Sequence, residues 1–130
     1  MAIPANNRPP GLDPPRLDPP RRIAAHLLLT AAGERVRRPL VEFASDGRIR
    51  SVAQWRDADR EPFTVFYAGL LVPDFPTDYR AAFAAVAADR TTPLDRLLPR
   101  TPQGVTVLLT GIDYERLLLT DRTTIRRVMP

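Results

Sequence analysis

The chain has 130 residues, which fits one domain, and 44% of them are hydrophobic, enough to form a folded core. The absence of cysteine excludes disulfides and thiolate metal sites. The formal net charge is +4, but all 19 basic residues are arginine and 15 acidic residues lie among them, so we expect a solvated charged surface. No apolar run approaches the roughly 20 residues that span a bilayer, and no secretory signal is present, so we expect a cytoplasmic protein.

Residues 1–22 are rich in proline, and we expect them to form a flexible tail. Seven of the 15 prolines lie there, and the pentapeptide LDPPR occurs twice in succession, at 12–16 and 17–21. Proline fixes φ and removes a backbone donor, which favours polyproline II or disorder. A ligand for an aromatic groove is the alternative, although no two of these prolines have the three-residue spacing of a PxxP motif.

Short runs of alternating hydrophobicity, bounded by turn residues, predict about seven strands in a domain that spans residues 23–130. The runs are 23–30, 36–43, 49–52, 63–67 with its continuation at 70–72, 105–110, 117–120 and 125–129. Pro39 indicates an edge strand or a bulge. Asp46 and Gly47 predict a type I′ turn between antiparallel strands.

Two helices are predicted between the strands. Tyr79, Ala82, Phe83, Val86 and Ala87 recur at helical spacing and predict a main helix over about 77–89, with a Thr or Asp cap at its start. A hydroxyl followed by proline at 92–93 predicts a short helix over about 93–98. The fold class is therefore a mainly β sandwich or flattened barrel with a helical insert at 76–99.

Two runs of the sequence resemble the amidohydrolase, or metallo-dependent hydrolase, superfamily. RIAAHLLLTAAGERVRRPLVEFASDGRIRSVAQW…FYAGLLVPDF is similar to the start of the small β-domain, with DGRI at 46–49 as its hairpin and GLLVPDF at 69–75 leading into the catalytic barrel. GVTVLLTGIDYERLLLTDRTTIRRV, at 104–128, is similar to the strands that close the same β-domain after the barrel. The resemblance implies that the C-terminal strands fold back beside the N-terminal ones.

The same resemblance implies that the catalytic barrel is missing. In the family a metal-binding His-x-His pair follows this segment, and by position it would fall at Tyr79 and Ala81. A TIM barrel needs about 250 residues, but 28 residues separate Phe75 from Gly104. We therefore expect only the composite β-domain, with its main helix covering the apolar face that a barrel would otherwise contact.

The chain offers few residues for catalysis. His26 is the only histidine and lies in a predicted strand, where packing or edge exposure is expected, and Ser45 and Ser51 are the only serines. Two pairs of carboxylates fall in polar loops and are expected to be solvated: Asp57 with Asp59, and Asp113 with Glu115. We therefore predict a protein that is not an enzyme, with no catalytic, metal or cofactor-binding residue.

The resulting hypothesis is a non-catalytic structural or interaction module. Its partners would be a second copy, giving a homodimer, or another protein subunit. The alternatives are an accessory subunit that completes a separate metallohydrolase barrel, and an arginine-rich nucleic-acid binder, which the interspersed acids make less favoured. The predicted interaction surface comprises Tyr79, Phe83, Val86, Arg35, Arg37, Arg38, Arg48 and Arg50.

Overall fold

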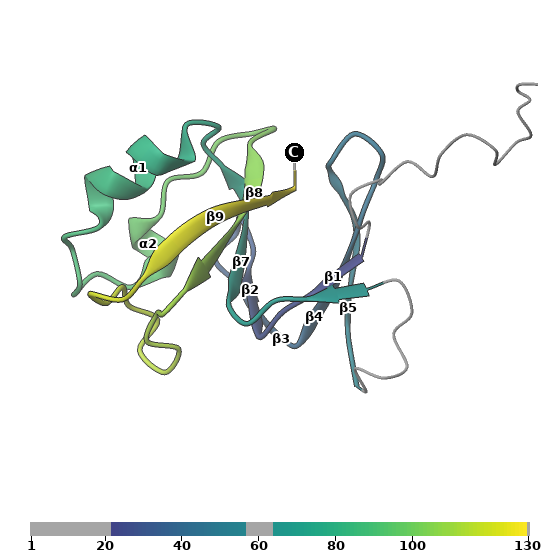
Figure 1. The fold of residues 1–130 in the computed structure, drawn as a ribbon, viewed down its shortest axis with the longest axis horizontal. Coiled ribbons are helices and arrows are strands. Elements are labelled where there is room, and N and C mark those ends of the chain that lie inside the picture. Colours follow the sequence, from purple (N-terminus) through teal and green to yellow (C-terminus); the bar gives the residue numbers. More distant parts are fainter. Residues whose placement is uncertain (1–21, 57–63, 130) are drawn as a thin grey trace, which may run out of the picture.

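The computed structural model describes residues 22–56 and 64–129, which form two β-sheets and a layer of helices (Figure 1). Sheet one has the strand order β5-β4-β1-β6, and sheet two has the order β3-β2-β7-β8-β9. The strands are β1 (Arg22–Ala24), β2 (Leu27–Leu29), β3 (Arg35–Arg37), β4 (Pro39–Phe43), β5 (Ile49–Gln54), β6 (Thr64–Phe66), β7 (Leu70–Phe75), β8 (Val105–Thr110) and β9 (Thr124–Met129). The helices are α1 (Tyr79–Val86) and α2 (Leu94–Leu97). The predicted mainly β, two-sheet architecture is confirmed, and the described strands do not close into a barrel.

Three segments of chain pass from one sheet to the other at a shared bend. At this bend β1 leads into β2, β3 into β4, and β6 into β7, and the two sheets diverge from it (Figure 1). Backbone hydrogen bonds continue across it: the Arg38 N–H donates to the His26 carbonyl over 3.1 Å, and the Tyr67 N–H donates to the Ala24 carbonyl over 2.9 Å. The bend separates segments that the sequence pattern alone would join, so nine strands are present in the described residues where about seven were predicted.

Two apolar cores lie on the two faces of sheet two. The inter-sheet core comprises Ile23, Ala25, Leu28, Val41, Phe43, Leu71 and Leu108. The helix-side core comprises Leu27, Leu29, Leu70, Val72, Phe75, Leu94, Leu98, Val105, Val107, Leu109, Ile112, Leu117 and Leu119. The strands β2, β7 and β8 contribute buried residues to both cores because successive side chains point to opposite faces, as Leu70 and Leu71 do.

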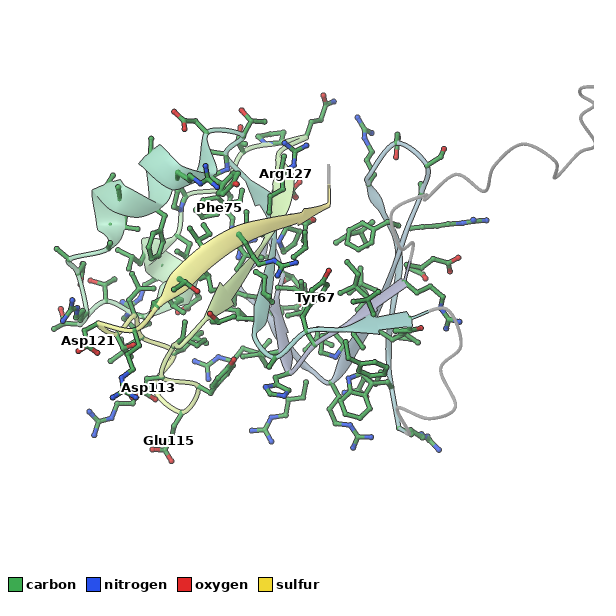
Figure 2. All side chains as sticks on the ribbon, in the orientation of Figure 1. Tyr67, Phe75, Asp113, Glu115, Asp121 and Arg127 are labelled. Carbon is green, nitrogen blue, oxygen red and sulfur yellow. The ribbon has the colours of Figure 1, made fainter. Side chains whose placement is uncertain are left out.

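The C-terminal strands pair with the N-terminal ones, as the sequence predicted. β8 is antiparallel to β7, with Leu71 opposite Leu108, and β9 is antiparallel to β8. Gly104 allows the close approach at the start of β8, because a Cβ there would lie 2.2 Å from the carbonyl oxygen of Phe75. Phe75 itself is fully buried in the helix-side core (Figure 2).

Two local predictions in the first hairpin were wrong. Pro39 lies in an interior strand and not at an edge, and the bulge in the pairing of that strand falls at Glu42 and Phe43 instead of at Pro39. The proline is tolerated because it is the first residue of β4, directly after Arg38 at φ 52°. The turn is not type I′, because Gly47 has a positive φ of 88° and Asp46 does not. Its Gly47 N–H donates to the Ala44 carbonyl over 2.9 Å, which gives a three-residue loop that ends in a left-handed glycine.

The segment over 117–120, predicted as a short strand or an extended stretch, belongs to a loop that covers sheet two. It makes an isolated bridge between Asp113 and Leu118, and Leu117 has a φ of 57°. Leu117 and Leu119 are buried in the helix-side core, so the hydrophobicity that suggested a strand serves packing. The Leu117 carbonyl also accepts a hydrogen bond of 2.8 Å from the first N–H of α2, at Leu94.

Both helices are shorter than predicted, and neither has the predicted side-chain cap. Asp78 occupies the cap position of α1, but its side chain makes no capping hydrogen bond. The Thr92 hydroxyl does not cap α2 and instead donates to Asp89 over 2.7 Å. Among the described helices, none is long and apolar enough to cross a membrane.

Candidate interaction surface

The outer face of sheet one is the face turned away from sheet two. Ala24 is in register with Leu40 on β4 and with Phe66 on β6, so these side chains share a face. Their neighbour Ile23 belongs to the inter-sheet core, which assigns Ala24, Leu40 and Phe66 to the outer side. In the described residues no helix or strand packs on this face. Sheet two, in contrast, packs against sheet one on one face and against the helices on the other.

Trp55 lies across this face at the bend. Its backbone N–H donates to the Arg38 carbonyl over 2.9 Å, which continues the β4–β5 pairing past the end of β5. Its indole Nε1–H donates to the Ala25 carbonyl over 3.1 Å, and its ring meets the Phe66 ring edge to face at 5.6 Å. These contacts fix the indole so that it spans from β5 to β6 over the central strands.

A hollow of about 280 Å³ opens beside the two rings. Its lining is mostly apolar and comes from both sides of the bend: Ala25, His26, Trp55, Phe66, Tyr67 and Ala68. We call these residues the bend hollow. Phe66 is 40% exposed, a large exposure for a phenylalanine that is held against a tryptophan.

Charged and polar groups contact two of the residues that line the bend hollow, Trp55 and His26. The Arg38 guanidinium lies over one face of the Trp55 ring at 4.7 Å and donates to the Arg56 carbonyl over 2.9 Å. On the other side the exposed ring of His26 meets the Tyr114 ring at 5.9 Å, edge to face. Partial burial raises the pKa of Tyr114 above its ordinary value, so the phenol stays neutral and can donate a hydrogen bond at physiological pH.

The predicted arginines lie at three places on the molecule and do not form one surface. Arg37 and Arg38 lie at the bend, and the Arg37 carbonyl accepts a hydrogen bond from Gln54. Arg48 and Arg50 lie at the opposite end of the β4–β5 hairpin, where Arg48 faces Asp46 at 3.8 Å. Arg35 is at the start of β3, on the far edge of sheet two.

The predicted helix surface is largely used by the fold itself. Tyr79, Phe83 and Val86 pack against the helix-side core, as the sequence predicted, and all three are partly buried. α1 nevertheless contains no fully buried residue. Leu94 and Leu98 near α2, together with the loop leucines, supply the fully buried part of the cover.

A second hollow, of about 290 Å³, lies where the sheets diverge. It is lined by Gly47, Arg48, Ile49, Pro73, Asp74, Gln103, Gly104 and Thr106. Asp74 and Gln103 have φ values of 54° and 60°, and their strain accompanies the bulge where β7 pairs with β8. The Asp74 carbonyl accepts a hydrogen bond of 2.7 Å from Thr101, so this irregular backbone is held by the fold.

The paired carboxylates, which were predicted to be solvated, form no common site in the described residues. Asp113 accepts a hydrogen bond of 2.9 Å from the Arg116 N–H, and Glu115 points away from it at the tip of the same loop (Figure 2). Asp57 and Asp59 lie outside the described residues, as does the proline-rich tail before Arg22. Within residues 22–56 and 64–129, no three His, Asp or Glu side chains are grouped to hold a metal ion.

No family model and no curated protein sequence matches the chain. The resemblance to the β-domain of amidohydrolases therefore stays a prediction.

Sequence reasoning missed Trp55 as a candidate binding residue. It is the only tryptophan and it follows β5 with the same alternation as Ala53, which places both on the outer face. That alternation was a usable signal. The contact with Phe66 was not predictable, because it depends on the order of strands in sheet one.

Proposed function

We propose that the chain is a non-catalytic interaction module, similar to the accessory β-domain of amidohydrolases, that binds an extended proline-containing segment in the bend hollow. The observation that carries this proposal is the pairing of Trp55 with a 40% exposed Phe66 on the outer face of sheet one. Exposed aromatic rings that are held in place by other contacts offer apolar area at a low entropic cost.

The lining of the bend hollow suits proline better than a charged ligand. Aromatic-lined grooves bind proline-rich segments because the polyproline II helix is already extended and has no internal hydrogen bonds to break. The indole N–H of Trp55 is engaged by the Ala25 carbonyl, so the rings offer mainly apolar area. His26 lines the hollow, and the Tyr114 ring contacts His26. Both side chains carry polar groups that can donate to the ligand's backbone carbonyls.

The geometry favours a peptide over a nucleic acid. Base stacking needs a free aromatic face, and one face of Trp55 is already occupied by Arg38. The arginines that would contact phosphates are divided between the two ends of the hairpin. A continuous basic stripe, which is the usual feature of a nucleic-acid interface, is therefore absent from the described part of the chain.

Titration of the full-length chain with a polyproline peptide tests this proposal. The emission of Trp55 reports directly on the hollow, because the chain has no other tryptophan. Pro14, Pro15, Pro19 and Pro20 are replaced by alanine for this experiment, so that the chain's own proline pairs cannot compete. We expect a saturable change in emission, and a Phe66→Ala variant should weaken binding by about tenfold or more.

Val52→Ala is a matched control. Val52 is 42% exposed, close to the 40% of Phe66, but it is in register with Val41 and therefore lies on the other face of sheet one. This variant should bind the peptide as the parent does. Binding that survives Phe66→Ala, or a salt-sensitive response to an oligothymidylate in place of the peptide, would refute the proposal.

A further inference from the structure

We propose that the bend hollow is occupied by the chain's own N-terminal segment, through one of the two LDPPR repeats at residues 12–21. This inference rests on the proposed function and names the ligand. The sequence alone gave the prolines no receptor, and the structure supplies an aromatic hollow in the same molecule.

The point where the described chain begins makes this contact possible. β1 starts at Arg22 in sheet one, and the side chain of Arg22 is in register with Glu42 on the outer face. The hollow begins at Ala25, only three residues further along the chain, or roughly 10 Å in a strand. The 21 preceding residues can extend to roughly 65 Å as polyproline II, so they can turn back and reach the hollow.

The LDPPR repeat contains side chains that are complementary to the apolar lining of the bend hollow. Each LDPPR unit places an apolar leucine and two prolines within four residues, and proline pairs pack on aromatic rings without losing backbone hydrogen bonds. An aspartate precedes each pair, at Asp13 and Asp18. Arg38 lies over the Trp55 ring and, with Arg56, lines a separate hollow that shares Trp55 with the bend hollow, so these guanidinium groups can face that carboxylate.

A ligand within the same chain has an advantage over a separate molecule. A short tether gives an effective concentration in the millimolar range, so weak contacts suffice for high occupancy. An external partner would then have to displace the tail, which makes the tail an autoinhibitory ligand.

Quenching of Trp55 fluorescence by acrylamide distinguishes a chain whose tail occupies the bend hollow from one whose hollow is empty. We expect Trp55 to be shielded in the natural chain and more strongly quenched when Pro14, Pro15, Pro19 and Pro20 are replaced by alanine. Replacing Pro4, Pro9 and Pro10 instead should leave the quenching unchanged, since these residues lie outside the repeats. The natural chain should also bind the polyproline peptide about tenfold more weakly than the repeat variant, if the tail fills the hollow for nine-tenths of the time.

The outcomes separate this inference from the proposed function. If the natural chain and the repeat variant show equal quenching and bind the peptide equally, the tail is not the ligand but the hollow still binds proline segments. If neither binds the peptide, the proposed function fails as well. Shielding that disappears on dilution would overturn the contact within one chain and indicate exchange of tails between two copies.

Discussion

Sheets one and two share three continuous segments of chain but differ in how they are covered. Sheet two is enclosed on both faces, by sheet one on one side and by the helices and the loop over 111–119 on the other. Within residues 22–56 and 64–129, sheet one packs through one face only, and its outer side carries Trp55 and the exposed Phe66. The difference indicates that sheet two provides most of the stability, while sheet one carries the binding surface that we propose.

The largest expected effect compares two phenylalanines, one in each sheet. Phe75→Ala removes a fully buried ring from the helix-side core and should lower the free energy of unfolding by about 3–5 kcal/mol. Phe66→Ala removes a 40% exposed ring from sheet one and should cost clearly less. Urea denaturation of both variants measures the two values, and equal losses would contradict the division of roles.

A smaller effect concerns the layer that covers sheet two. Leu94 is fully buried near the start of α2, so Leu94→Ala should cost about 2–5 kcal/mol. Phe83 on α1 is only partly buried, and its truncation should cost less although its ring is larger. If thermal unfolding shows the opposite order, α1 and not α2 is the main cover of the helix-side core.

The smallest expected effect on stability concerns Asp89, in the segment between the two helices. Asp89 accepts hydrogen bonds from the Thr92 hydroxyl and from the backbone N–H groups of Thr91 and Thr92, which lower its pKa from 3.8 to about 2. Because the folded pKa is the lower one, Asp89 stabilises the fold above about pH 4 and loses that contribution as the pH falls toward 2. The difference in stability between the natural chain and Asp89→Asn should therefore shrink over this window.

Asp95→Asn is the control for removing one negative charge from the same region. Asp95 is exposed on α2, so its substitution tests charge without the hydrogen bonds that Asp89 accepts. Acid-induced unfolding followed by circular dichroism measures all three proteins. A pH dependence that Asp89→Asn leaves unchanged would show that the loop does not depend on this carboxylate.

The sequence predicted the sheets better than it predicted the surfaces. Alternation located the strands and helical spacing located α1, because both periods come from local geometry. The bend was not predicted, because the sequence has no proline or glycine between Ala24 and Leu27 and only the pairing of strands shows that the chain bends at His26 and changes sheet. The loop at Leu117 was mistaken for a strand because a buried loop and a strand can have the same short apolar run.

The candidate site depended on contacts between distant segments. Trp55 and Phe66 are brought together by β1 and β4, which lie between the strands that carry them. The arginines stood out in the sequence by their number, but the hairpin separates Arg38 from Arg48. Charge composition therefore predicted less about the surface than the position of a single aromatic residue did.

Amide chemical-shift mapping is the most direct test that the outer face of sheet one is the binding surface. The polyproline peptide is added to the full-length repeat variant labelled with ¹⁵N. We predict shifts that concentrate around Ala25, His26, Trp55 and Phe66, with α1 and the hollow near Gln103 unchanged. Shifts centred on α1 or on Gln103, or no shifts at saturating peptide, would contradict this account.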